Sequence, residues 1–186
     1  MKRSALFHLH RRSEASFMEH HGWEIPAWFR SPQMEAAGVR NSVGLIDVSY
    51  RAKFLSKTRL ESGSWRLGSH HFLTVGDPPL DPTISAMDVT NVYADVLLAG
   101  RYSKDVLAKL TSVDLSDNAL PNLCCTQANV AHTHAIVLRE DLPHLSAYHI
   151  LISREYSEGV WESIIHAGHE YDLCPFGLKA LELLST

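Results

Sequence analysis

Apolar residues recur in a regular order through the second half of the chain. Tyr148, Ile150 and Ile152 stand at every second position, which predicts a strand over 147–153. Apolar residues at helical spacing predict a helix over 154–167. The complete expected order is strand 86–91, strand 94–98, helix 103–111, two strands within 126–138, strand 147–153 and helix 154–167. This order is typical of a split βαβ layout, an antiparallel sheet with helices on one face, and therefore of an α+β fold.

The first half of the chain has shorter patterns, separated by turn-forming residues. Ser4 can cap a helix and Gly22 can end one, so a helix is expected over 4–20. The remaining expected elements are a helix over 33–41 after Ser31-Pro32, a strand pair formed by 44–49 and 52–55, and a hairpin with arms 65–67 and 70–75 around Gly68-Ser69. The two halves therefore differ in pattern.

A proline-rich stretch separates these two halves. Residues 76–82 include Pro78, Pro79 and Pro82, which remove backbone donors and fix the backbone. Neither a strand nor a helix can continue through this stretch. We therefore expect an N-terminal subdomain over 1–82 and a C-terminal split-βαβ subdomain over 83–186, together forming one module.

Composition and charge narrow the classes of partner. The 186 residues are 45% hydrophobic and 20% charged, as in ordinary globular proteins. A formal net charge of -4 supplies no positive field for a phosphate backbone, so nucleic acid is not an expected partner. No apolar run approaches the roughly 20 residues of a membrane helix. Lys2 and Arg3 lead into further charged residues rather than the apolar core of a secretory signal, so a cytoplasmic location is expected.

Several side chains are candidates for chemistry. His132 and His134 would share one face of a strand, and His166 and His169 lie one helical turn apart, but no Cys or carboxylate completes either set at a standard metal-binding spacing. No metal site is therefore expected. The three cysteines form no CxxC pair and are expected to be reduced, buried and inert. Asp47 is interpreted as a turn or capping carboxylate, and the alternative is that it borders a ligand channel.

Four sequence blocks resemble one protein family. His21-Gly22-Trp23-Glu24-Ile25-Pro26 is followed by Met34-Glu35-Ala36-Ala37-Gly38-Val39-Arg40 and by Val43-Gly44-Leu45-Ile46-Asp47-Val48-Ser49. In this order they resemble the opening of the glycine cleavage T-protein family of aminomethyltransferases. Pro175-Phe176-Gly177-Leu178-Lys179-Ala180 resembles the end of that family's folate-binding module. The resemblance covers nearly the whole chain and implies two fused antiparallel split-βαβ (ferredoxin-like) units.

The resemblance also implies a function in folate-linked one-carbon metabolism. Tetrahydrofolate would be the acceptor of a one-carbon unit from a small amine-derived substrate. Between Leu60 and Trp65, however, the family's glycine-rich stretch with its paired aspartates is missing, so no catalytic residue is assigned and the isolated chain is expected to transfer little. The alternative is a noncatalytic subunit, since the segment from His70 to Leu138 also resembles the gamma subunit of sarcosine oxidase.

The resemblance assigns four folate-binding candidates. Tyr50 and Arg51 stand where the family has His and Met, directly after the third block. Tyr148 and His149 stand where the family has a tyrosine and a glutamate whose carboxylate binds the pterin. A neutral imidazole accepts one hydrogen bond where a carboxylate accepts two. His149→Glu is therefore expected from the sequence to tighten folate binding.

The sequence also predicts that the chain assembles with a second copy or with other subunits. The chain ends shortly after Leu184 without the C-terminal barrel of a T-protein, which would leave apolar surface uncovered. A homodimer or a larger complex is therefore expected, with residues 23–29 or 176–184 at the contact. The alternative for the aromatic residues within 23–29 is that they belong to the core.

Overall fold

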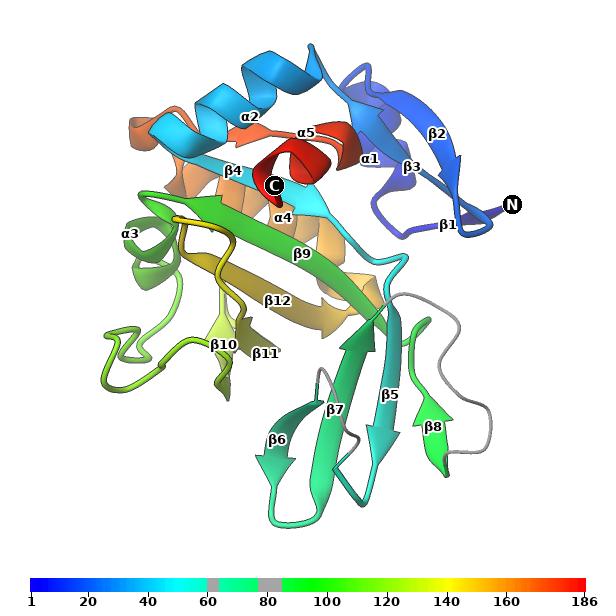
Figure 1. The fold of residues 1–186 in the computed structure, drawn as a ribbon, viewed down its shortest axis with the longest axis vertical. Coiled ribbons are helices and arrows are strands. Elements are labelled where there is room, and N and C mark those ends of the chain that lie inside the picture. Colours follow the sequence, from blue (N-terminus) through cyan, green and yellow to red (C-terminus); the bar gives the residue numbers. More distant parts are fainter. Residues whose placement is uncertain (60–63, 77–84) are drawn as a thin grey trace.

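A six-stranded sheet forms the centre of the computed structural model, which describes residues 1–59, 64–76 and 85–186 (Figure 1). In spatial order its strands are β10 (Cys125–Val130), β11 (Thr133–Arg139), β12 (Ala147–Ser153), β9 (Tyr93–Gly100), β4 (Val43–Asp47) and β13 (Cys174–Pro175). Neighbouring strands are antiparallel except β13, which runs parallel to β4. The sheet therefore joins strands from both halves of the chain.

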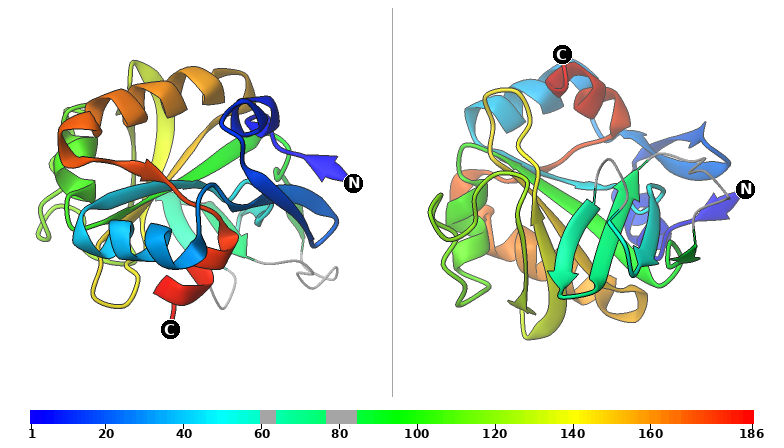
Figure 2. Two further views of the ribbon diagram at one scale, coloured as in Figure 1. Left: turned by 90° about the horizontal axis from the view of Figure 1, so that it is seen from above. Right: turned by 60° about the horizontal axis from the view of Figure 1, so that its bottom comes forward.

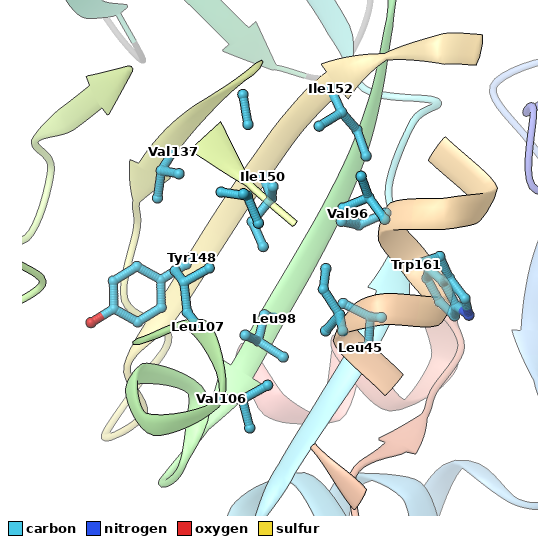
Figure 3. Close-up of a cluster of buried hydrophobic side chains, with 14 of the residues drawn as sticks. Leu45, Val96, Leu98, Val106, Leu107, Val137, Tyr148, Ile150, Ile152 and Trp161 are labelled. Carbon is cyan, nitrogen blue, oxygen red and sulfur yellow. The ribbon is translucent and has the colours of Figure 1, made fainter. Parts of the chain in front are cut away.

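One face of this sheet is covered by α3 (Ser103–Ala108) and α4 (Ser157–Ala167), and α1 (Phe7–Arg12) lies beside α4. The side chains that fill the space between sheet and helices are shown in Figure 3. They include Leu98 and Ile150 from the strands, Val106 and Leu107 from α3, and Trp161 from α4. This apolar cluster is the largest in the described part of the chain, and its burial stabilises the sheet.

The opposite face of the sheet is covered by α2 (Pro32–Asn41) and α5 (Leu178–Leu184), as Figure 2 shows in its left view. A small sheet packs beside them, with the order β1 (Lys2–Arg3), β3 (Trp23–Trp28), β2 (Ser16–His20). Trp23 and Ile25 of β3 share a buried cluster with Leu97 of β9 and Phe176. Trp23 thus belongs to the core, whereas Trp28 is 37% exposed.

A four-stranded sheet lies at the lower end of the molecule in Figure 1. Its order is β6 (Ser64–Gly68), β7 (His71–Gly76), β5 (Ala52–Ser56), β8 (Ala86–Asp88). Trp65 and Leu73 from this sheet pack against Ile136 and Leu151 of the central sheet. Two short 3-10 turns, η1 (Arg154–Tyr156) and η2 (His169–Tyr171), flank α4.

Most of the expected elements are present, but one expected helix and one expected strand pairing are wrong. The order of the second half, the helix after Ser31-Pro32 and the hairpin around Gly68-Ser69 are confirmed. The helix expected over 4–20 is wrong, because the helix ends at Arg12 and Glu14 adopts a left-handed backbone with φ 58° before β2 begins. The pairing of 44–49 with 52–55 is also wrong. Both edges of β4 are already occupied, by β9 and β13, while β5 pairs with β7 and β8.

The α+β class is confirmed, but two separate split-βαβ units are not. β4 from the first half lies within the sheet of the second half, and helices cover both faces of that sheet rather than one. The expected boundary at residue 82 falls outside the described residues, so the division into 1–82 and 83–186 stays a prediction. β5 and β8, on either side of this boundary, pair with each other.

Glu35 joins three segments on the α2 side of the sheet. Its buried carboxylate accepts hydrogen bonds from the backbone N–H groups of Phe29 and Arg30, both at 2.7 Å, and from that of Gly177 at 2.9 Å. Only glycine fits at 177, because a Cβ there would lie 2.2 Å from the carbonyl oxygen of Ala27. The resemblance blocks around Glu35 and Gly177 therefore meet at one structural joint.

Glu35→Gln is expected to lower the free energy of unfolding by about 1–3 kcal/mol, because the new amide N–H₂ turns a donor toward backbone donors. Urea unfolding of the variant and of the wild type measures this difference. Glu162→Gln, on the exposed face of α4, is the matched control and should change stability little. Equal stability of all three proteins would contradict the role given to Glu35.

Candidate functional site

A cavity of about 400 Å³ lies between the end of β4, the strands β9 and β12, and α5. Its walls are apolar and are formed by Val48, Leu97, Leu142, Leu178 and Leu181. Its polar lining comprises His20, Arg51, Glu140, Asp141, His149 and Glu182, together with Tyr50 and Ser185. Apolar walls with a few convergent polar groups are typical of small-molecule sites, which span about 300–1,000 Å³.

Three charged or titratable side chains converge on one side of this cavity. The Arg51 guanidinium Nη1 lies 2.9 Å from Nε2 of His149 and 3.4 Å from Oε2 of Glu140. Nε2 of His149 lies 3.3 Å from the same Glu140 oxygen. The hydrogen bond from His149 and the charge of Arg51 lower the pKa of Glu140 to about 2, against the opposing effect of partial burial. Glu140 is therefore ionised at neutral pH.

Asp95 holds the other side of the His149 ring. Nδ1 of His149 lies 3.0 Å from Oδ1 of Asp95, and both side chains are almost completely buried. Burial alone would lower the pKa of His149, but the charges and hydrogen bonds of Asp95 and Glu140 raise it. When His149 is neutral, Nε2 accepts from Arg51, and when it is charged, Nε2–H donates to Glu140. The ring therefore has a partner in each protonation state.

A buried lysine lies behind this group. Lys53 is 0% exposed, and its Nζ donates to the carbonyl oxygens of Ser49 at 3.1 Å and Arg51 at 2.8 Å. Burial lowers the pKa of Lys53, while the charges of Asp95 and Asp47 act in the opposite direction. Lys53 therefore fixes the backbone that carries Arg51 into the cavity.

Asp47 lies behind the cavity and does not line it. Its carboxylate accepts from the hydroxyls of Ser4 and Ser49, each at 2.5 Å, and lies 3.2 Å from Nε2 of His10. Burial raises the pKa of Asp47, but these partners lower it below its usual range. Ser49 Oγ also accepts from the backbone N–H of Asp95 at 3.1 Å. These contacts favour the structural interpretation of Asp47.

The structure brings three of the four candidate residues to this cavity. Tyr50, Arg51 and His149 line it. Tyr148 does not, because neighbouring residues of a strand point to opposite faces of a sheet. Tyr148 is 1% exposed and packs in the apolar cluster near Leu107 (Figure 3).

Glu140 is a residue of the cavity that the sequence did not predict. It directly follows β11, and its backbone N–H bonds to the carbonyl oxygen of Ala147 at the start of β12. This pairing places the Glu140 side chain beside that of His149, nine residues further along the chain. An acidic residue at the end of an expected strand was the only sequence signal, and it does not show where the chain returns.

The other candidate groups do not form a site around a metal. Among residues 1–59, 64–76 and 85–186, no three His, Cys, Asp or Glu side chains are arranged to hold a metal ion.

The three cysteines carry free thiols, but the expectation that all are buried is wrong, since Cys124 is exposed. Burial raises the pKa of the Cys125 and Cys174 thiols, which disfavours thiolate chemistry. No helix in the described residues has the length and apolar character needed to cross a membrane.

Curated relatives of this chain are aminomethyltransferases. Those of Geobacillus sp. (strain WCH70) and Halothermothrix orenii (strain H 168) are each 25% identical to it over 231 aligned positions. The matches cover 99% of this chain and 63% and 64% of those proteins, so the chain spans less than two thirds of their length. Because the alignments run over 231 positions and the chain has 186 residues, at least 45 aligned positions are gaps in this chain, where the relatives have additional residues. The expected deletion lies between Leu60 and Trp65, and residues 60–63 at this point are outside the described residues. The deletion therefore stays a prediction.

Two solved structures share the fold. The glycine cleavage system aminomethyltransferase T from Bartonella henselae superposes with a TM-score of 0.80 at 16% identity, covering 99% of this chain and 62% of that chain. A chain of the heterotetrameric sarcosine oxidase from Corynebacterium sp. U-96 superposes with a TM-score of 0.60 at 16% identity, covering 76% of this chain and 95% of that chain. The profile of the family described as the GCVT N-terminal domain matches residues 69–186. This chain therefore belongs to the GCVT N-terminal domain family.

Proposed function

We propose that this chain binds tetrahydrofolate in folate-linked one-carbon metabolism, as an aminomethyltransferase-like protein of the glycine cleavage T-protein type. The observation that carries this proposal is the cavity of about 400 Å³ lined by Tyr50, Arg51, Glu140 and His149 in a member of this family. Tetrahydrofolate would supply a nucleophilic nitrogen that accepts a one-carbon unit from an amine-derived donor.

The residues around the cavity fit a flat, partly apolar ligand. Leu97, Leu178 and Leu181 offer apolar walls that exclude water from a bound ring. Arg51, Glu140 and His149 are held by one another and by Asp95, so they keep their positions without a ligand. The contribution of this chain is therefore to bind and orient the folate.

Filling the cavity should weaken folate binding. Leu181 lines the cavity from α5, whereas Leu183 on the same helix does not line it and is 38% exposed. We expect Leu181→Trp to weaken tetrahydrofolate binding at least tenfold and Leu183→Trp to leave it unchanged, as measured by titration calorimetry. Equal affinity in both variants would place the folate elsewhere, and no binding by the wild type would overturn the proposed function.

The second candidate function is that of a noncatalytic subunit in a complex of the sarcosine oxidase type. It is favoured by the match with the Corynebacterium sp. U-96 structure, in which 95% of the matched chain is covered. Such a subunit would contribute an interface, as a homodimer or within a larger complex. It predicts that the isolated wild type shows no affinity for tetrahydrofolate and that light scattering finds it in an assembly larger than a monomer.

A further inference from the structure

Another cavity, of about 410 Å³, lies where the four-stranded sheet meets the start of β10, and we call it the β6–β10 cavity. Sγ of Cys125 and Nε2 of Gln127 on β10 donate to the carbonyl oxygens of Arg66 and Leu67 on β6, at 3.2 and 3.1 Å. Its described lining includes Trp65, Phe72, Arg59, Arg66, Cys124 and Cys125. None of these residues lines the cavity of the candidate site, so the β6–β10 cavity is a separate place on the molecule.

The charges that line the β6–β10 cavity are positive. Arg59 and Arg66 line it, and no Asp or Glu is among the described residues that do so. Neither guanidinium forms an ion pair within the part of the chain that the structure describes, and Nε of Arg66 donates to the carbonyl oxygen of Gly68 at 3.2 Å. Two cations beside the apolar rings of Trp65 and Phe72 create a local positive field in a chain whose net charge is -4. The cavity therefore attracts anions.

An exposed thiol lies in this positive field. Cys124 lines the cavity directly before β10 begins. Its backbone is fixed, because its N–H donates to the carbonyl oxygen of Pro121 at 3.1 Å and its carbonyl oxygen accepts from the N–H of Arg139 at 2.9 Å. Cys125 also lines the cavity, but it is partly buried, and burial together with the charge of Cys124 raises the pKa of its thiol. Cys124 is therefore the thiol that a reagent in the cavity meets.

We propose that Cys124 is a modification site for small anionic disulfides, which Arg59 and Arg66 bind in the β6–β10 cavity through their carboxylates. The thiolate sulfur of Cys124 attacks one sulfur of the disulfide, a new S–S bond forms and the original S–S bond breaks. The departing half takes up the proton that Cys124 released and leaves as a thiol. Cys124 is thereby oxidised to a mixed disulfide, and the small disulfide is the oxidant. This inference does not depend on folate binding.

The test uses three disulfides of similar length and different charge. Dithiodipropionate carries two carboxylates, bis(hydroxyethyl) disulfide carries no charge, and cystamine carries two ammonium groups. Mass spectrometry of the intact protein measures the rate at which each forms a mixed disulfide, and Cys124→Ser identifies the part of the rate that belongs to Cys124. Relative to their rates with N-acetylcysteine amide, we expect dithiodipropionate to react with Cys124 faster than cystamine by roughly 3- to 10-fold, the effect of two exposed ion pairs.

Two double variants separate the local charges from the net charge. Arg59→Gln/Arg66→Gln should remove the preference for the anion and leave the rate with the uncharged disulfide unchanged. Arg11→Gln/Lys104→Gln removes two exposed cations elsewhere and is the matched control, which should keep the preference. A preference that survives in Arg59→Gln/Arg66→Gln, or mixed-disulfide formation that is as fast in Cys124→Ser as in the wild type, would overturn the proposal.

Ionic strength gives a measurement on the wild type alone, which decides the question even if the arginine variant fails to fold. Salt screens the two guanidinium groups, so it should lower the ratio of the anion rate to the cation rate. If only the net charge of -4 acted on the reagents, salt would raise this ratio instead. A ratio that rises or stays constant with salt would therefore overturn the proposal. None of these outcomes bears on tetrahydrofolate binding, which is measured separately.

Discussion

Asp95→Ala is expected to lower the free energy of unfolding by about 3–5 kcal/mol, the usual effect of removing one partner from a buried charge pair. Asp95 is 0% exposed and lies against His149 and near the charge of Lys53. Without it, Lys53 loses the nearby negative charge that most opposes the effect of burial on its pKa, and Nδ1–H of His149 loses its acceptor. Urea unfolding at neutral pH measures the loss.

The pH dependence distinguishes a lost charge from lost packing. The charge and hydrogen bond of His149 lower the pKa of Asp95 below its ordinary value of 3.8, although burial opposes this. The stability that Asp95 contributes is therefore present above about pH 3.8 and is lost as the pH falls through its folded pKa. The difference between the wild type and Asp95→Ala should shrink at acidic pH. Glu162→Ala, on the exposed face of α4, is the control, and a constant difference at every pH would contradict this account.

The elements of the second half could be predicted because each carries its own periodic signal. Tyr148, Ile150 and Ile152 alternate along β12, and every one of them is buried against the helices. The order of the strands was less accessible. Nothing in residues 43–47 indicates that β4 inserts between β9 and β13 rather than pairing with β5, since a buried strand reads as an apolar run whichever neighbours it has.

The candidate site could be predicted where local sequence carried the resemblance. Arg51 and His149 were found in this way, and the structure places them 2.9 Å apart. Tyr148 shows the limit of this approach, since one position along a strand moves a side chain to the other face of the sheet. Asp95 and Glu140 depend on pairing between distant segments, which a single sequence does not display.

The surroundings of His149 reverse the effect expected for His149→Glu from sequence alone. A glutamate at this position would lie between the carboxylates of Asp95 and Glu140, which now contact opposite sides of the imidazole. Three carboxylates would then share the positive charges of Arg51 and Lys53, so each carboxylate would be less well neutralised. The substitution is therefore expected to destabilise the protein by about 3–5 kcal/mol near neutral pH rather than to tighten folate binding.

The sign of the pH effect tests this cause. Repulsion and burial would raise the folded pKa of the new glutamate above its unfolded value, so the loss of stability should be largest at high pH and should decrease as the group takes up a proton. His149→Gln is the matched control, because a neutral amide can still donate to Asp95 and accept from Arg51. We expect this control to lose much less stability than His149→Glu when both are unfolded in urea at pH 8, and we expect the gap between the two variants to narrow at pH 5. A His149→Glu variant as stable as the wild type at pH 8 would show that Arg51 and Lys53 neutralise a third carboxylate. That result would contradict this account, and the folate affinity of the variant would then test the expectation from sequence that His149→Glu tightens binding.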